Sequence, residues 1–269
     1  LGFKSMPPEM REDKGELELA AKGKIPILVS LDDICGDLHV HSKWSDGARS
    51  IEEMAEYAMK NRGYKYMAIT DHSKSTRIAN GMDDKEVLKQ IKEIENINKK
   101  LGRDFIKKGI EVDILPDGTL DLSDETLSQL DWVTASIHSS FKRDNTDRII
   151  KACNNPYVSC IGHPTGRLIG SREPYGINIE KVLEAAKRTN TALEINAQPQ
   201  RMDLNDEMAM AACEKGVTMV ISTDSHDSNQ FAYMQLGIYI ARRAWCTADN
   251  ILNTKSWAEI EKFLNKKRK

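Results

Sequence analysis

The sequence predicts an α/β fold in which parallel strands close into a barrel and the functional residues lie at the carboxyl ends of the strands. From residue 34 onward, seven short runs rich in β-branched residues alternate with amphipathic segments, a pattern typical of parallel strands joined by helical crossovers. All six histidines follow or end such runs. An open sheet collects ligands at one or two points, whereas a closed barrel brings nearly every strand end to one rim.

The predicted elements follow from these patterns of hydrophobic residues. Strands are expected near 34–41, 64–70, 109–115, 132–138, 157–162, 191–197 and 217–223. Helices are expected near 50–61, 84–101, 123–130, 145–153, 178–189, 205–215 and 256–267, the last of them outside the barrel. In the first of these helices, Ser50 and Glu53 predict a capping box, and Gly63 is placed for a left-handed cap at the C-terminus.

Two parts of the chain differ in composition. Residues 1–33 are polar and mixed, with a short helical stretch near Glu16–Ala21, and we expect them to form a linker or extension from a preceding region. Residues 34–269 are expected to form one domain, since the chain of 269 residues is long enough to bury the core of one barrel. The first residue is Leu, so we expect a fragment of a longer chain.

Composition excludes several classes of protein. The five cysteines are widely spaced and form no Cys-x-x-Cys pair, which favours reduced thiols in the cytoplasm over a disulfide frame. No apolar run has the length of a membrane span, and no signal peptide is recognisable. The net charge of −2 argues against a strongly basic DNA-binding surface. Bound divalent ions would reverse that charge locally, so a phosphate-rich substrate is not excluded. The basic end at 266–269 is expected to be a solvated helix terminus.

A His-x-His pair ends the first predicted strand. Residues i and i+2 of a strand point to the same side, so His39 and His41 can reach one metal ion, and Asp46 follows after a short loop. The alternative is that the two histidines form a cross-strand pair and that Asp46 caps the next helix.

The same arrangement recurs at two other strand ends. Asp224 and His226 are again two residues apart. Asp71 precedes His72 directly and could either ligate a metal ion or orient His72.

A carboxylate inside a predicted strand supports the same interpretation. Glu111 is flanked by apolar residues, and burial without a partner would cost several kcal/mol. A cation is one suitable partner. The alternative is that Glu111 or Asp113 pairs with an arginine or lysine across the barrel. His138 and His163 complete a set of nine candidate metal ligands: His39, His41, Asp46, His72, Glu111, His138, His163, Asp224 and His226.

Other polar residues follow the strands without forming so clear a pattern. Glu194 could support a metal ligand or pair with a lysine or arginine. No Gly-x-Ser-x-Gly elbow occurs, which disfavours a serine nucleophile. Five cations could either grip substrate phosphates or form ordinary salt bridges at the rim: Lys74, Arg77, Arg167, Arg172 and Arg201.

These motifs resemble the PHP (polymerase and histidinol phosphatase) domain family. The resemblance covers the chain from about Ile34 onward. The motifs that carry it are Asp37-Leu-His-Val-His41, Thr70-Asp-His72, Gly109-Ile-Glu111, Ser136-Ile-His138, Gly162-His-Pro164 and Thr223-Asp-Ser-His226. The resemblance implies a distorted (β/α)7 barrel of the TIM-like type, with a site for three divalent metal ions at the carboxyl ends of its strands.

A narrower resemblance is to the C-terminal PHP domain of bacterial family X DNA polymerases. It rests on Trp44-Ser-Asp-Gly47, His138-Ser-Ser-Phe141, Gly162-His-Pro-Thr-Gly-Arg-Leu-Ile169 and the stretch Met6-Pro-Pro-Glu-Met-Arg-Glu12. It implies that the polymerase region of a longer chain is a partner of this domain.

The resemblance also implies how the ligands divide among the ions. His39, His41, Glu111 and Asp224 would hold one ion. Glu111 would bridge to a second ion held by His138 and His163, and Asp46, His72 and His226 would hold a third. An aspartate at position 46, where many PHP phosphatases have histidine, favours the harder Mn²⁺ in that third site.

The function implied is 3′→5′ exonuclease action on DNA ends in DNA repair, with abasic-site endonuclease or 3′-phosphatase activity as further options. A hydroxide activated by metal would be the nucleophile, and Glu111, His39 and Asp224 are the predicted catalytic residues. Mn²⁺ is expected to support turnover, with Zn²⁺, Fe²⁺ or Co²⁺ as other occupants.

Two alternative functions remain open from the sequence. One is a phosphomonoesterase of the histidinol-phosphate phosphatase type, in which Glu194 or Asp227 would bind the amine of the substrate. The other is a non-catalytic module, stabilised by metal, that braces a polymerase region.

Overall fold

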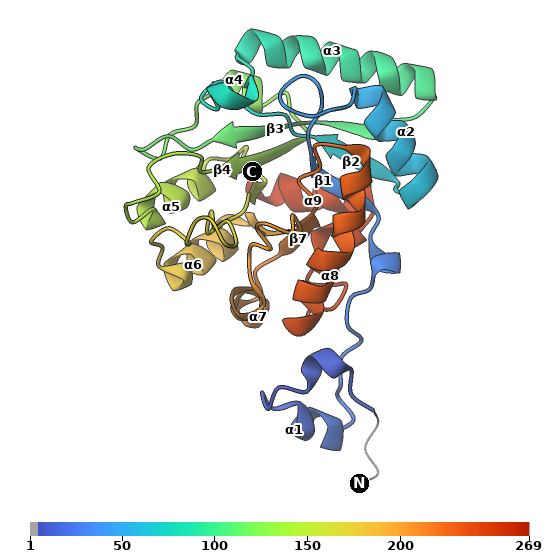
Figure 1. Cartoon of the computed structure of the whole chain (residues 1–269), viewed down its shortest axis with the longest axis vertical. Helices are drawn as coiled ribbons and strands as arrows, with labels where there is room; N and C mark the ends of the chain where they lie inside the picture. The colour runs from blue at the N-terminus through green and yellow to red at the C-terminus, as the bar shows by residue number, and fades with distance from the viewer. Residues whose placement is uncertain (1–4, 269) are drawn as a thin grey trace.

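The computed structural model describes residues 5–268, and its centre is one sheet of seven parallel strands paired in sequence order (Figure 1). The strands are β1 (Gly36–Val40), β2 (Tyr66–Ile69), β3 (Ile106–Asp113), β4 (Trp132–Ser136), β5 (Cys160–Ile161), β6 (Ala192–Asn196) and β7 (Met219–Ser222). The predicted fold class is therefore confirmed. β3 begins earlier than expected because its first residues pair with β2 and its later residues with β4.

Helices surround this sheet (Figure 1). They are α1 (Glu16–Ala21), α2 (Ile51–Arg62), α3 (Asp84–Leu101), α4 (Asp124–Leu127), α5 (Thr146–Asn154), α6 (Ile179–Thr189), α7 (Asp206–Lys215), α8 (Met234–Arg243) and α9 (Trp257–Lys267). The capping box of Ser50 and Glu53 is present, and Gly63 has the left-handed conformation expected of it. α4 is a single turn, shorter than predicted. α8 was not among the expected helices. Its Gly237 lies so close to Ile221 that a Cβ atom would come within 2.3 Å of that side chain.

The barrel closes between its first and last strands through a few specific bonds. The backbone N–H of His41 donates to the carbonyl of Ser225 at 2.8 Å, and the N–H of Ser225 donates to the carbonyl of His39 at 3.3 Å. The hydroxyl of Thr223 also donates to the buried carboxylate of Asp37 at 2.6 Å. These contacts join the carboxyl ends of β1 and β7, where the candidate ligands are.

Two apolar clusters fill the domain. The larger lies between the strands and the surrounding helices. The smaller contains strand residues such as Leu38, Tyr66 and Trp132 together with Ile260 and Leu264 of α9. In a closed barrel such inward-pointing side chains form a packed interior. Contact with α9 seals that interior at the end opposite the candidate ligands.

An irregularity in β1 directs its side chains. The pairing of β1 with β2 shifts between Asp37 and Val40. Leu38 belongs to the smaller cluster and Val40 to the larger one, although strict alternation would place both on the same side. Bulges re-aim side chains in this way, and here the shift leaves His39 and His41 both directed into the mouth of the barrel.

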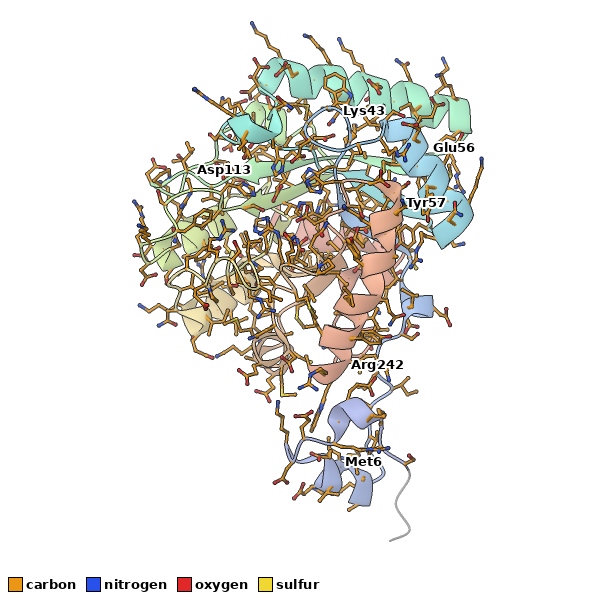
Figure 2. The ribbon with its side chains drawn as sticks, viewed as in Figure 1. Met6, Lys43, Glu56, Tyr57, Asp113 and Arg242 are labelled. Atoms are coloured by element: carbon orange, nitrogen blue, oxygen red, sulfur yellow. The ribbon has the colours of Figure 1, made fainter. Side chains whose placement is uncertain are left out.

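The segment before β1 lies partly apart from the barrel (Figures 1 and 2). α1 and the labelled Met6 belong to this segment, and Arg242 at the end of α8 faces it (Figure 2). The guanidinium of Arg242 contacts Glu9 at 2.5 Å, and Met10 is fully buried. Val29 is also buried in the larger cluster. The boundary predicted at residue 34 stays a prediction. Between residues 5 and 268, no helix combines the length and apolar character that a bilayer crossing requires.

Candidate metal centre

The carboxyl ends of the strands bring the nine predicted ligands into one group. His39 lies in β1 and Glu111 in β3, and the other seven lie in the segments that follow β1, β2, β4, β5 and β7. Each has a charged or imidazole atom within 4 Å of another member of the group. Strand ends therefore assemble a site from parts of the chain more than a hundred residues apart.

Glu111 occupies the centre of this group. Its Oε1 lies 2.9 Å from Nε2 of His163 and 3.4 Å from Nε2 of His138. Its Oε2 lies 2.9 Å from Nδ1 of His72 and 3.4 Å from Nε2 of His39. Within residues 5–268 no lysine or arginine forms an ion pair with this carboxylate. Because its two oxygens face different histidines, Glu111 is placed to bridge two cations.

Two aspartates complete the group. Asp46 faces three imidazoles, with its oxygens 3.7 Å from Nδ1 of His41, 3.6 Å from Nε2 of His72 and 3.3 Å from Nε2 of His226. It does not cap α2, whose N-terminal cap is Ser50. Asp224 lies 3.0 Å from Nε2 of His41 and 3.7 Å from Nε2 of His39.

These separations suit metal coordination. Two ligand atoms on one Zn²⁺ ion, each about 2.1 Å from it, lie roughly 3–4 Å apart. Three overlapping groups of ligand atoms lie within 4.8 Å of one another: His41, Asp46, His72 and His226; His39, His41 and Glu111; and His72, Glu111 and His138. The residues present can therefore hold more than one divalent ion.

The hydrogen bonding of the ring nitrogens gives an independent indication that these residues fit metal ions. Nε2 of His39, both ring nitrogens of His41 and Nε2 of His138 are buried without a hydrogen bond. A buried polar atom without a partner costs about 1–3 kcal/mol and is rare in folded proteins. Cations bound between these rings and the shared carboxylates would supply the partners that the nitrogens lack.

The electrostatics of the group point in the same direction. Burial alone would raise the pKa of Glu111, but His39, His72 and His138 hold it well below the usual range. Burial opposes the ionisation of Asp224 too, yet His39 and neighbouring imidazoles keep its pKa well below normal. Both carboxylates are therefore ionised at neutral pH, and cations bound there would compete with protons for the histidines.

A carboxylate from β6 fixes the first histidine. Nδ1 of His39 donates to Oε1 of Glu194 at 2.7 Å, which turns Nε2 toward Glu111. The other oxygen of Glu194 accepts the backbone N–H of His163 at 2.6 Å. Of the two roles open to Glu194, the structure thus shows support of a histidine. Such partners orient metal ligands and raise their basicity.

The roles of two further residues differ from expectation or were not anticipated. Asp71 neither approaches the ligand group nor orients His72: it accepts hydrogen bonds from Ser42 and Ser45, and so braces the loop that carries Asp46. Asn196, the last residue of β6, was not among the candidates. Its amide donates to Glu194 and Asp224 at 3.1 Å each. Its place at a strand end was the signal that could have identified it.

The backbone at two ligands is unusual. His163 and Asp224 have φ angles of 27° and 53°, in the left-handed region that non-glycine residues seldom adopt. Before His163, a Cβ atom on Gly162 would come within 2.4 Å of the Ser136 hydroxyl. Residues held in such conformations cluster at functional sites.

The five predicted phosphate contacts fall into different settings. Arg201 lies beside the ligand group, with Nε 3.4 Å from Asp224 and a buried Nη1 that has no partner. Arg167 donates to the carbonyl of Arg201 at 2.7 Å, and Lys74 pairs with Asp84 at 3.4 Å, so both are engaged within the protein. Arg77 is exposed.

The last of these cations lies farther out on the rim. Arg172 donates to the carbonyl of Gly166 at 2.8 Å and covers the ring of Phe141. Of the five, Arg201 is therefore the one that lies against the ligand group itself.

Comparison with known proteins places this site in a family. The PHP domain matches residues 37–198, more than half of the chain and most of the ligand group. This chain belongs to the PHP family. It is 47% identical over 268 residues to "DNA polymerase/3′-5′ exonuclease PolX" of Bacillus subtilis (strain 168). That alignment covers 98% of this chain but 46% of the relative, so the chain spans about half the length of that protein.

Other relatives are shorter proteins. A "Probable phosphatase" of Thermoanaerobacter sp. (strain X514) is 32% identical over 247 residues, which cover 87% of this chain and 95% of the relative. The fold also matches the histidinol phosphate phosphatase of Lactococcus lactis, solved with zinc, L-histidinol and phosphate. The TM-score is 0.56 at 17% identity, with 78% of this chain and 93% of that chain covered. The resemblance to the polymerase-linked PHP domains is confirmed.

Proposed function

We propose that this PHP domain is a metal-dependent phosphodiesterase that degrades DNA from the 3′ end. The observation that carries the proposal is that buried ring nitrogens of His39, His72 and His138, none of which has a hydrogen bond, face Glu111 at the mouth of the barrel. Without bound cations this group of buried polar atoms would destabilise the fold. Several adjacent cations are able to bind and hydrolyse a phosphate ester.

We propose that the residues would divide among three cation positions in the way that the family resemblance implies. His39, His41, Glu111 and Asp224 would hold one ion, Glu111 would be shared with a second at His138 and His163, and Asp46, His72 and His226 would hold a third. Bound divalent cations activate water at neutral pH and neutralise the negative charge of the phosphate. We propose Mn²⁺ for turnover, because Asp46 supplies hard oxygen ligands, with Zn²⁺, Fe²⁺ or Co²⁺ as other occupants.

The protein's own groups position these ligands and the substrate. Glu194 holds Nε2 of His39 toward Glu111 by accepting the proton on Nδ1. Arg201 has a buried, unpartnered Nη1 beside Asp224 and would donate it to a phosphate oxygen. The Ser45 hydroxyl donates to the buried Asp71 at 2.5 Å and so helps to hold the loop that carries Asp46.

DNA is the proposed substrate because the relative named "DNA polymerase/3′-5′ exonuclease PolX" is 47% identical over nearly the whole of this chain. The domain would work in DNA repair in the bacterial cytosol, as part of a longer chain with a polymerase region. Abasic-site cleavage and 3′-phosphatase action use the same chemistry and are further proposed activities.

The small-molecule alternative has less support in the structure. Histidinol phosphate would need a carboxylate for its amine, and the two candidates are already engaged. Glu194 binds His39 and the backbone of His163, and Asp227 pairs with Arg49 at 3.2 Å and caps the turn after it.

A primer-degradation assay tests the proposal. With Mn²⁺, the full chain should shorten a 5′-labelled single-stranded oligonucleotide one nucleotide at a time, and His39→Ala should abolish this. Histidinol phosphate should be turned over far more slowly. Full digestion by His39→Ala would refute the assigned site. Faster turnover of histidinol phosphate would favour the phosphatase, and a loaded protein that cleaves neither would favour a bracing module.

A further inference from the structure

A hollow on the surface of the barrel lies between two loops that also carry candidate metal ligands. It is formed by the loops after β4 and β5, has a volume of about 710 Å³, and is lined by Ser140, Phe141, Lys142, Arg143, Arg172, Glu173 and Pro174. We call these seven residues the Phe141 platform. Phe141 follows the ligand His138 by three residues, and Arg172 follows the ligand His163 in the next loop. The same two loops therefore carry metal ligands and the platform.

Planar groups form the floor of this hollow. The guanidinium carbon of Arg172 lies 3.9 Å from the centroid of the Phe141 ring. The Nε of Arg172 donates to the carbonyl of Gly166 at 2.8 Å, which fixes the guanidinium in this position. Phe141 also stacks on the buried Tyr175, with ring centroids 6.3 Å apart and planes 17° apart. Phe141 and Arg172 are both partly exposed, whereas Tyr175 beneath them is buried, so this stack of planar groups is accessible from the side of Arg172.

The charge of the platform is positive. Lys142, Arg143 and Arg172 line it together with a single acid, Glu173. This excess of positive charge is local, since the whole chain has a net charge of −2. Burial and the neighbouring Arg201 both lower the pKa of Arg172. Arg201 itself touches Asp224, so positive groups extend from the ligand group to the platform.

We propose that the Phe141 platform binds one nucleotide of a single-stranded polynucleotide next to the phosphate under attack. The base stacks on the partly exposed guanidinium of Arg172, which the Phe141 ring supports from its other side, and the neighbouring phosphate pairs with Lys142 or Arg143. Proteins that hold single strands combine aromatic or guanidinium planes with cations in this way. The inference rests on the proposed phosphodiesterase function and deepens it, since it names a polynucleotide as the substrate class.

A base-stacking subsite should favour oligonucleotides over small phosphodiesters. A small diester that fills only the metal centre has no base to place on the platform. An oligonucleotide has one, and the loss of one stacking contact weakens binding about tenfold or more. The platform therefore matters for oligonucleotides and much less for small diesters.

The test compares two substrates in the metal-loaded full chain. Phe141→Ala and Arg172→Ala should lower kcat/KM for a single-stranded oligonucleotide about tenfold more than kcat/KM for bis(p-nitrophenyl) phosphate, mainly through KM. Phe141→Trp, which keeps an aromatic plane, should restore the oligonucleotide value. The matched controls are Tyr239→Ala, a half-exposed aromatic residue on α8, and Lys262→Ala on α9. Neither control should change the ratio of the two substrates.

The outcomes separate this inference from the proposed function. Equal losses on both substrates, or no loss on either, would overturn the platform while the phosphodiesterase stands. If the wild type cleaves neither substrate, the proposed function fails, and fluorescence anisotropy with a labelled oligonucleotide decides the platform alone. A tenfold weaker affinity of Phe141→Ala would then support it, and an unchanged affinity would overturn it. Thermal melting should show the variants to be folded.

Discussion

The two ends of the barrel are made from the same seven strands but from different kinds of side chain. At the carboxyl ends lie carboxylates and histidines, several of the histidines have unpartnered ring nitrogens, and two of the candidate ligands have positive φ. At the amino ends, Leu38, Tyr66 and Trp132 pack against α9 with no more than 1% of their surface exposed. One end keeps polar groups available for ligands, and the other end stabilises the fold.

This difference has a physical consequence. Burial of large apolar side chains stabilises the barrel whether or not metal is bound. The converged carboxylates and imidazoles are satisfied only when cations or protons lie between them. Substitutions at the two ends should therefore separate activity from stability, and the predictions below test that separation from the largest expected effect to the smallest.

Glu111→Gln should have the largest effect. The substitution keeps the shape of the side chain but removes the charge that two cation positions would share. We expect phosphodiester hydrolysis to fall by about a thousandfold or more, together with the metal content per chain. Steady-state kinetics and elemental analysis measure the two quantities. The exposed Glu207→Gln on α7 is the control, and a Glu111→Gln protein with normal activity would contradict the account.

Trp132→Ala should act on stability at the opposite end. Trp132 is fully buried in the cluster sealed by α9, and its truncation should lower the free energy of unfolding by about 3–5 kcal/mol. Urea denaturation measures this change. The folded fraction should keep the metal content of the wild type. A variant that loses metal while its unfolding curve stays unchanged would remove the distinction between the two ends.

Glu194→Gln should weaken the site without unfolding the domain. The substitution removes the negative charge that orients His39 and raises its basicity. Metal affinity should fall about 10- to 100-fold, as measured by competition with a chelating dye. Glutamine has one acceptor oxygen for the buried donors that Glu194 binds, so the melting temperature of the metal-free protein should also fall, although the domain stays folded. An unchanged affinity would show that Glu194 is not needed to position His39.

Lys267→Met should produce the smallest effect, visible in its pH dependence. Burial lowers the pKa of Lys267 to about 8, below its value in the unfolded chain, so the folded state releases this proton first. Wild-type stability should therefore rise relative to the variant between pH 8 and about 10.5, by on the order of 1 kcal/mol given its partial exposure. Urea denaturation at pH 7.5 and 10 measures the difference. A difference that falls with pH would contradict the assigned direction.

The sequence was sufficient to predict the barrel and the convergence of the nine candidate ligands for a simple reason. Parallel strands end at one rim, and a spacing of two residues lets His39 and His41 share a side, although the pairing of β1 shifts beside them. The part that sequence could not predict depends on contacts between distant segments. Asp71 accepts hydrogen bonds from Ser42 and Ser45, and Glu194 accepts one from His39. The stacking of Arg172 on Phe141 brings two loops into contact. No local pattern encodes these partners.

α8 shows the same limit among the elements of secondary structure. Its apolar face packs on β6 and β7, and Gly237 allows the helix to approach Ile221 of β7 closely. Read alone, a glycine in the middle of a helical pattern lowers the expectation of a helix.

The number of metal ions retained per chain tests the central claim most directly. After saturation with Mn²⁺ or Zn²⁺ and desalting, elemental analysis should find about three ions per wild-type chain, and one fewer in Asp46→Asn, which lacks the carboxylate shared by His41, His72 and His226. A wild-type chain that retains no ion, or an Asp46→Asn chain that retains as many as the wild type, would contradict the account.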